Sequence, residues 1–305
     1  MINIVNRNDF DILIGEISEL NNEFNFHSTP DTIAKKYFHS DKEKLKRLKR
    51  SVILFFLFEQ TMLIAPREDG IYEKETIDKR YDAFIAAILK PIPEKIEIIS
   101  NIKVLTWNYD LQFELAYSKY KELKITAIQN EIQSNPKISN TAGSEFTNNS
   151  FSIVHLNGIA YSTAENRPDY MGEVISDDFQ RINYIVDVYH GMLSANSVPK
   201  NGGIELLSFA WEKFNPDYTI MENDLLNKAF EIANDTDCLV INGYSFPTFN
   251  RLIDKRILKE MKKLNKVYIQ SPQYNDLEKI IKEIKPNINI ENIGYWNQFF
   301  IPDWS

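Results

Sequence analysis

Residues 102–110 read IKVLTWNYD, and this stretch decides the fold of the 305-residue chain. Its first six residues form a short apolar run rich in β-branched side chains, which predicts a buried strand. Polar residues follow at once, and a helical pattern then continues over residues 113–120. The order strand, polar loop, helix is typical of a parallel sheet with right-handed crossovers, in which ligands bind at the carboxyl ends of the strands.

The same order recurs in the second half of the chain. Residues 238–241 predict a strand, 242–245 a turn and 249–262 a helix, while a further strand over 150–156 stops at Asn157 and Gly158. Another apolar run at 267–269 precedes a helical pattern at 277–284, and 288–290 predicts a last short strand. These patterns together predict an α/β protein with a Rossmann-like parallel sheet flanked by helices.

The N-terminal third has a different pattern, because apolar residues recur there at spacings of three and four, as in helices. We therefore expect a largely helical region over residues 1–95 that packs on the sheet, with one long helix over 42–58. Residues 96–305 form the Rossmann-like core, with a helical insertion near 165–230. Residues 130–149, which are rich in Asn, Ser and Thr, predict an exposed loop.

Composition excludes several classes of protein. The net charge of −8 argues against a protein that grips phosphate backbones, so nucleic acid is not an expected partner. The single cysteine, Cys238, can form neither an internal disulfide nor a thiolate zinc cluster, which fits a reducing compartment and no structural metal. The N-terminus has no secretory signal, and the longest apolar run is far shorter than the ~20 residues of a membrane span. We expect a cytoplasmic protein without a membrane partner.

Two strand-to-helix junctions carry residues suited to a nucleotide. Asn108 and Asp110 could hold the two hydroxyls of a ribose, since Asn donates and accepts while ionised Asp accepts; by spacing alone, an Asx turn that caps the next helix is favoured. Gly243 and Ser245 could approach a phosphate, although a simple turn is the commoner meaning of this pattern. A serine nucleophile elbow is disfavoured, because no glycine stands two places after Ser245.

His155 and Asn157 lie on one face of the predicted strand, because side chains alternate along a strand, and Leu156 points into the opposite packing layer. A histidine there could act as a general base near neutral pH. A histidine satisfied by one or two hydrogen bonds at the sheet edge is at least as consistent with the pattern. The other histidines show no metal-ligand spacing, so no metal site is expected.

Three of these junctions, in this order, resemble the sirtuin-like family of nucleotide-binding proteins, in particular its bacterial branch linked to anti-phage defence. Thr106-Trp107-Asn108-Tyr109-Asp110 is similar to the Thr-x-Asn-Tyr-Asp segment of that family, and this is the most specific match. Residues 154–158 (VHLNG) resemble its hydrophobic-His-Gly segment, and 243–246 (GYSF), followed by Asn250, its Gly-x-Ser-Phe segment. Gln270 stands where the family has a polar residue near the adenosine. The resemblance runs from about residue 96 to 273.

The resemblance implies a bound NAD and hydrolysis of its nicotinamide–ribose bond to ADP-ribose and nicotinamide. Asn108 would contact the nicotinamide ribose and help to place the attacking water, and Asp110 would support it. Gly243 and Ser245 would hold the adenosine and phosphate side. Thr106 and Gly158, which belong to the matched segments, are also expected at the cofactor. A second copy of the chain or a defence protein are the partners that the family implies. Protein deacetylation is disfavoured, because the zinc ribbon of deacetylating sirtuins needs four cysteines.

Two departures from the family pattern stand out. Asn157 occupies the place of the catalytic histidine, and an amide cannot take up a proton at neutral pH, so the general-base role is lost or passes to His155. The glycine-rich phosphate loop is absent, and with it the first strand, which is central in such sheets. Its loss predicts unpaired backbone groups on the neighbouring strands, unless the natural protein is longer or another element or chain fills the place.

The alternative functions follow from these departures. One is a degenerate module that keeps the fold, binds a nucleotide or a protein, and has lost turnover. Another is an unrelated α/β fold whose junctions mimic the family, which predicts no affinity for NAD.

Overall fold

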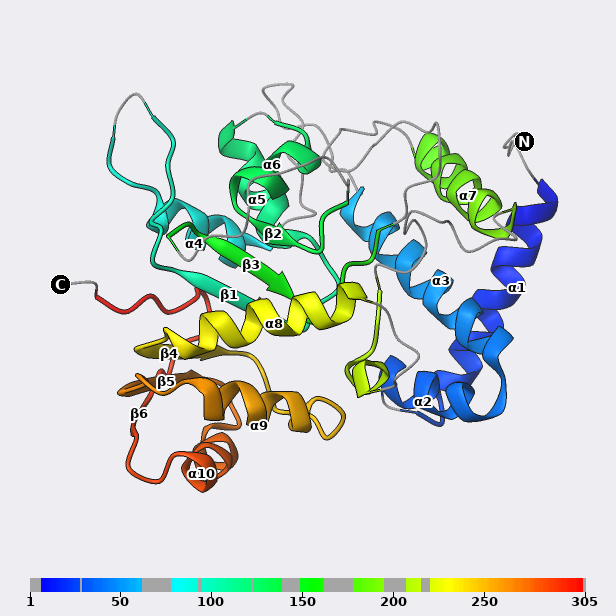
Figure 1. Ribbon diagram of the computed structural model, residues 1–305. Helices are drawn as coiled ribbons and strands as arrows, with labels where there is room; N and C mark the ends of the chain where they lie inside the picture. The colour runs from blue at the N-terminus through cyan, green and yellow to red at the C-terminus, as the bar shows by residue number, and fades with distance from the viewer. Residues whose placement is uncertain are drawn as a thin grey trace.

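The computed structural model describes the greater part of the chain as helices, strands and connecting loops (Figure 1). The described residues are 7–27, 29–61, 78–92, 95–121, 123–138, 149–161, 178–194, 207–214 and 220–303. The α/β class predicted from the sequence is confirmed, with parallel strands and flanking helices.

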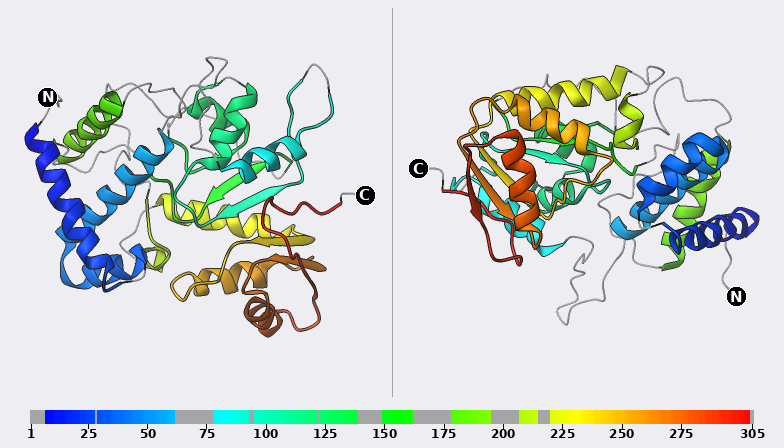
Figure 2. Two further views of the ribbon diagram at one scale, coloured as in Figure 1. Left: turned by 180° about the vertical axis from the view of Figure 1, so that it is seen from behind. Right: turned by 90° about the horizontal axis from the view of Figure 1, so that it is seen from below.

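Helices build the N-terminal region, as the spacing of apolar residues predicts. They are α1 (Arg7–Phe24), α2 (Pro30–Ser40), α3 (Lys42–Gln60) and α4 (Lys79–Ile88). The side chains of Thr29 and Asp41 cap α2 and α3 by accepting backbone N–H groups of the first turn. Helix α7 (Asp178–Ser194), which comes much later in the chain, lies beside α1 and α3 (Figures 1 and 2).

The first sheet contains the stretch that opened the sequence analysis. It is parallel, in the order β1 (Lys103–Thr106), β3 (Ser152–His155) and β2 (Ser134–Asn135), and α5 (Gln112–Lys121) and α6 (Ile125–Glu131) follow β1 in the chain. The prediction of an exposed loop over 130–149 is wrong where the structure describes it, because Ser134 and Asn135 are buried and pair with β3. Residues 139–148 lie outside the described part.

The second sheet is also parallel, in the order β4 (Cys238–Asn242), β5 (Lys266–Gln270) and β6 (Asn289–Asn292). Helices α9 (Arg251–Glu260) and α10 (Tyr274–Ile284) are its crossovers, and α8 (Ile220–Asn234) precedes it. These elements match the predicted strands and helices of the C-terminal half. The insertion near 165–230 contains α7, the short 3₁₀ helix η1 (Ala210–Phe214) and most of α8.

The two sheets are separate, and β1 and β4 are the strands through which they approach each other (Figures 1 and 2). Among the described strands, β1 pairs only with β3 and β4 pairs only with β5. Side chains join the two edges instead: the opposite charges of Lys103, on β1, and Asp235, just before β4, attract each other. The single predicted sheet is therefore present as two halves of three strands.

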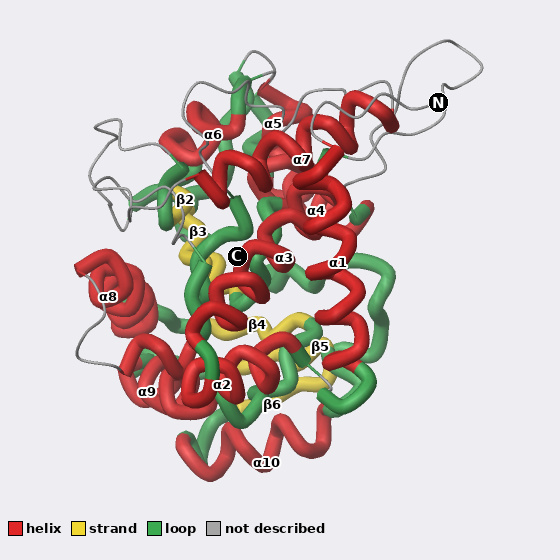
Figure 3. Tube along the Cα trace, turned by 90° about the vertical axis from the view of Figure 1, so that its right-hand side faces the viewer, coloured by secondary structure: helices red, strands yellow, loops and turns green. Residues whose placement is uncertain are grey.

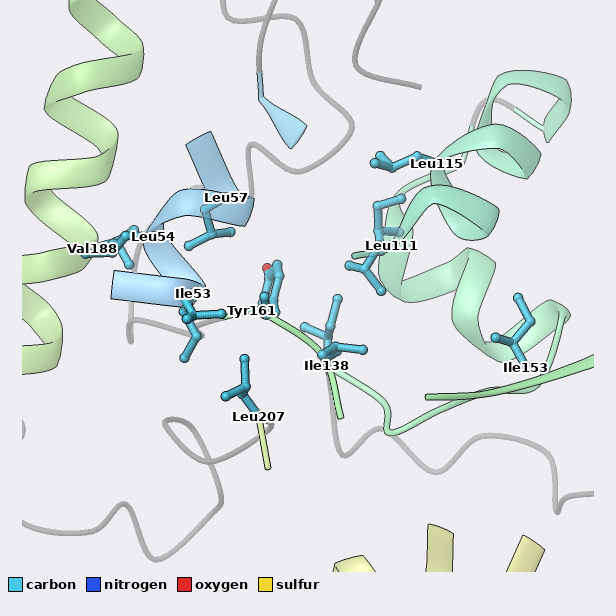
Figure 4. Packing of buried hydrophobic residues seen from close by; sticks show 14 of the residues in the cluster. Ile53, Leu54, Leu57, Leu111, Leu115, Ile138, Ile153, Tyr161, Val188 and Leu207 are labelled. Carbon is cyan, nitrogen blue, oxygen red and sulfur yellow. The ribbon is translucent and has the colours of Figure 1, made fainter. Parts of the chain in front are cut away.

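Two clusters of buried apolar side chains stabilise this arrangement. The larger joins α1–α5 and α7 to the α5 side of the first sheet, and Figure 4 shows Ile53, Leu57, Leu111 and Leu115 from it. The second contains Val154 and Leu156 together with α8, α9 and the second sheet, and it holds the two halves together. None of the described helices combines the length and the apolar character needed to cross a membrane.

Candidate functional site

Three polar loops meet around Trp107 at the carboxyl ends of β1, β3 and β4. The amide Nδ2 of Asn157, which follows β3, donates a hydrogen bond to the backbone oxygen of Trp107 at 3.2 Å. The Trp107 and Tyr244 rings are nearly parallel, with centroids 6.5 Å apart. The structure thus brings together the segments 106–110, 154–158 and 243–246 that the sequence singled out.

A buried carboxylate, Asp254 of α9, links two of these loops. Its Oδ1 accepts the Trp107 Nε1–H at 3.1 Å, and its Oδ2 accepts the Tyr244 hydroxyl at 2.7 Å. Burial raises the pKa of Asp254 to about 7, against the two hydrogen bonds, which lower it. Asp254 therefore ties the end of β1 to the end of β4 and titrates near neutral pH.

The loop after β4 has a constrained backbone. Gly243 has a φ of +60°, which glycine adopts without strain, and its N–H donates to the backbone oxygen of Gln270 at 3.0 Å. Phe246 has a φ of +51° although it is not glycine, and its side chain is anchored in the second apolar cluster. Gly243 and Ser245 are both exposed, so the loop presents the Gly243 backbone and the Ser245 hydroxyl group to the solvent.

Asn108 and Asp110 take different roles in the loop after β1. The Asn108 side chain is exposed, and its Nδ2 donates to the Tyr81 hydroxyl at 3.3 Å. Thr106 Oγ1 accepts the Asn108 backbone N–H at 3.0 Å, which shapes the turn. Asp110 Oδ1 accepts the backbone N–H of Gln112 at 3.2 Å, so Asp110 makes the Asx-turn contact at the start of α5. Burial raises the pKa of Asp110.

His155 faces α5 and is buried, with 1% of its surface exposed. Its Nε2 lies 2.8 Å from Oε1 of the fully buried Glu114, which also accepts the Ser134 hydroxyl. Burial lowers the pKa of His155, but the Glu114 carboxylate outweighs that effect, so the pKa lies above its ordinary value. Leu156 points the other way, into the second apolar cluster, as strand alternation predicts.

The two remaining candidate residues, Gly158 and Gln270, are buried and make hydrogen bonds to backbone groups. Gly158, with φ +70°, donates its N–H to the His155 oxygen at 2.9 Å and bridges to Leu207. Gln270 uses its whole amide on the C-terminal segment: Nε2 donates to the backbone oxygens of Tyr295 and Gln298, and Oε1 accepts the Phe300 N–H.

Helix α2 lies in front of part of the second sheet in Figure 3. Asp31 is in its first turn, and the charge of Asp31 adds to the burial that raises the pKa values of Tyr109 and Tyr244. Lys35 of the same helix places its ammonium 5.2 Å from the centre of the Phe249 ring. The α2 amino end therefore lies near both the β1 and the β4 loops.

Three buried amide oxygens at these strand ends have no hydrogen-bond partner among the described residues: Asn157 Oδ1, Asn242 Oδ1 and Asn250 Oδ1. Other groups there interact with one another, since Asn157 lies beside the Tyr109 hydroxyl and the Asn108 backbone lies beside His155. Buried polar atoms are nearly always hydrogen-bonded, to protein or to another molecule. The three amide oxygens are therefore candidates for contact with a polar ligand.

Sequence reasoning missed Glu114, Asp254 and Tyr81. A signal exists for the two carboxylates, since Glu114 stands three residues after Leu111 and Asp254 four residues before Leu258, on the apolar stripes of their helices. An acidic residue on an apolar stripe indicates a buried partner. The described residues contain no group of three or more His, Cys, Asp or Glu side chains that could hold a metal ion.

Comparisons of this chain with protein-family models, with curated proteins and with solved structures give no match.

Proposed function

We propose that the chain is a bacterial, cytoplasmic sirtuin-like protein that binds NAD at the carboxyl ends of β1, β3 and β4 and hydrolyses it to ADP-ribose and nicotinamide in anti-phage defence. One observation carries the proposal: three loops with the resembling motifs converge on Trp107, through Asn157, Tyr244 and Asp254. Ligands of parallel α/β sheets bind at this edge.

The exposed groups suit the two ends of NAD. Asn108 presents an amide, which can contact ribose hydroxyls and orient a water molecule. Gly243 and Ser245 present backbone and a hydroxyl group in the loop that leads from β4 to α9, and both groups can hydrogen-bond a phosphate. Thr106 and Asp110 shape the loop that presents Asn108, whereas Gly158 shapes the loop after β3.

Three carboxyl groups, Asp31, Asp110 and Asp254, lie near the strand ends, and burial raises the pKa of each. Cleavage of the nicotinamide–ribose bond builds positive charge on the sugar, which an ionised carboxylate in a poorly solvated site stabilises. Because a raised pKa favours the neutral carboxylic acid, this stabilisation is available only above the pKa of each group.

His155 is the candidate general base. Its Nε2 faces the Glu114 carboxylate, and a hydrogen bond to the Asn108 backbone also favours the protonated imidazole, so only a neutral His155 could accept a proton. The base acts only when neutral, and its pKa lies above the ordinary value. Turnover should therefore rise with pH through a value above about 6.5.

The first test measures nicotinamide release from NAD by the purified protein. We expect Asn108→Ala to lower the rate by roughly 100-fold, because the amide that orients water and ribose is lost. Asn101→Ala is the matched control, since Asn101 is an exposed asparagine just before β1, and its rate should equal that of the parent. Equal rates in both variants would contradict the role of Asn108.

A second test addresses His155. We expect His155→Ala to abolish hydrolysis and to leave NAD binding largely intact. In Glu114→Gln the carboxylate that raises the pKa of His155 is lost, so the rise of turnover with pH should move to lower pH. Unchanged turnover in His155→Ala would make His155 structural and leave the placement of water to Asn108.

The alternative is a non-catalytic nucleotide-binding or interaction module. The burial of His155 against Glu114 and the amide at position 157 favour it, because both reduce the supply of a base near the ligand. NAD binding in calorimetry without nicotinamide release would support the module. The absence of any NAD affinity would overturn both NAD hydrolysis and NAD binding, and would leave only a protein-interaction role.

A further inference from the structure

The C-terminal segment after β6, residues 293–303, crosses from the second sheet to the side of β1 and α4 (Figures 1 and 2, in red). We call these residues the C-terminal strap. Ile293 donates its backbone N–H to the Ile269 oxygen at 2.9 Å, and the Gln270 amide makes three further hydrogen bonds to the strap. The strap is therefore fixed to β5 at several points before it leaves the second sheet.

Phe299 is the side chain through which the strap contacts the other half of the molecule. Its ring meets the edge of Tyr81 with centroids 5.0 Å apart and planes at 88°, and it also contacts Phe84 and Phe113. The Arg80 guanidinium lies 5.5 Å from the centre of the same ring. Phe299 thus packs against α4 and α5, with a cation held beside its ring.

Tyr81 connects this aromatic group to the candidate site. Its ring is buried, with 9% of its surface exposed, and its hydroxyl accepts the Asn108 Nδ2–H at 3.3 Å. Burial, with the negative charge of Asp110, raises the pKa of Tyr81, so the phenol stays neutral and keeps its hydroxyl proton. The Asn108 amide, although exposed, is held at one end by a tyrosine that the strap covers.

We infer that Phe299 is a positioning residue: by packing on Tyr81 it fixes the orientation of the Asn108 amide. The inference rests on the proposed function for its effect on NAD, but the positioning itself is a property of the free protein. The strap in this way makes the geometry of the β1 loop depend on the second sheet, which holds the strap through Gln270.

Removal of the Phe299 ring frees one side of Tyr81. The ring of Tyr81 keeps its contact with Phe113, at 4.7 Å between centroids, but loses the packing on its other side. The hydroxyl that holds the amide of Asn108 is then fixed less firmly. A misplaced orienting group slows the chemical step more than it weakens binding of the rest of the ligand. For NAD turnover, we expect Phe299→Ala to lower kcat by roughly tenfold with little change in KM.

The deciding experiment uses the full chain without NAD. The side-chain amide resonances of Asn108 are identified in ¹⁵N-asparagine-labelled protein by their absence in Asn108→Ala. We expect these resonances to shift in Phe299→Ala and in Tyr81→Phe, and the double variant to show no further shift. Phe299→Tyr, which keeps an aromatic ring at this position, should restore the parent resonances.

Phe300→Ala is the matched control. Phe300 is the next residue of the strap, but its ring packs on Tyr268, with centroids 4.7 Å apart, away from Tyr81. Its removal should leave the Asn108 resonances in place. Parent-like Asn108 resonances in Phe299→Ala, or an equal shift in Phe300→Ala, would overturn the inference. If Phe299→Ala fails to fold, Phe299→Leu gives the same readout with less loss of buried surface.

The two proposals fail separately. A protein that releases no nicotinamide but shows the Asn108 shift contradicts the proposed hydrolysis and supports the positioning by Phe299. A protein that hydrolyses NAD equally well with alanine at position 299, with unchanged Asn108 resonances, contradicts the positioning alone.

Discussion

At the scale of single residues, Asp254 is a buried carboxyl group that titrates near neutral pH. It accepts hydrogen bonds from Trp107 and Tyr244, yet burial raises its pKa to about 7. A carboxyl group with a raised pKa opposes folding once it is ionised. The two hydrogen bonds favour the ionised form, but the burial of its charge outweighs them, so the folded state is less stable at alkaline pH.

This predicts a pH dependence of stability. The unfolded chain has an Asp pKa near 3.8, so between about pH 4 and pH 7 the folded state binds more protons and stability falls as the pH rises. We expect Asp254 alone to account for a loss on the order of 4 kcal/mol between pH 4 and pH 8. Asp254→Asn, which cannot ionise, should remove that part of the slope in urea unfolding. An unchanged slope would contradict the assignment.

The sequence allows the exposed candidate residues to be located but not their partners. Asn108, Gly243 and Ser245 follow directly on apolar runs, so their place at the strand ends can be predicted. The partner of His155, Glu114, stands 41 residues away in the chain. Which carboxylate reaches a histidine depends on how α5 packs on β3, and spacing along the chain does not determine that.

At the scale of elements, helices and strands with a long apolar pattern can be predicted from the sequence, whereas very short strands cannot. The helices α1, α3, α9 and α10 and the strands β1, β3 and β5 all lie where periodicity and β-branched runs place them. Strand β2 was missed because it consists of Ser134 and Asn135, two polar residues that β3 buries and pairs. Pairing with a neighbour, rather than local preference, makes this segment a strand.

Gln270 provides a prediction at this scale. Its amide makes three hydrogen bonds to the C-terminal strap, at 2.6, 2.8 and 3.0 Å. We expect Gln270→Ala to lower the free energy of unfolding by about 2 kcal/mol and to speed amide exchange over residues 295–300. Gln273→Ala, in the loop after the same strand, is a suitable control. A stable variant with weaker NAD binding would instead support a contact between Gln270 and the adenosine.

At the scale of the whole molecule, two sheets of the same polarity are arranged with β1 opposite β4. The sequence predicts parallel strands, and the described strands form two separate parallel sheets. The candidate site lies over this division, with Trp107 on one side and Tyr244 on the other. Its geometry therefore depends on the relative placement of the halves, which no local pattern encodes.

The division between β1 and β4 also has a mechanical consequence. Within each half, hydrogen-bonded ladders resist separation cooperatively, because neighbouring bonds break together. Between β1 and β4, separation of the two sheets is opposed by apolar packing and by the attraction between Lys103 and Asp235. The hydrogen bonds of Asp254 and the C-terminal strap also connect the two sheets. We expect local unfolding that separates the two sheets between β1 and β4 to require less free energy than unfolding within either sheet. The candidate residues therefore lie where, among the described strands, side chains alone connect the two sheets.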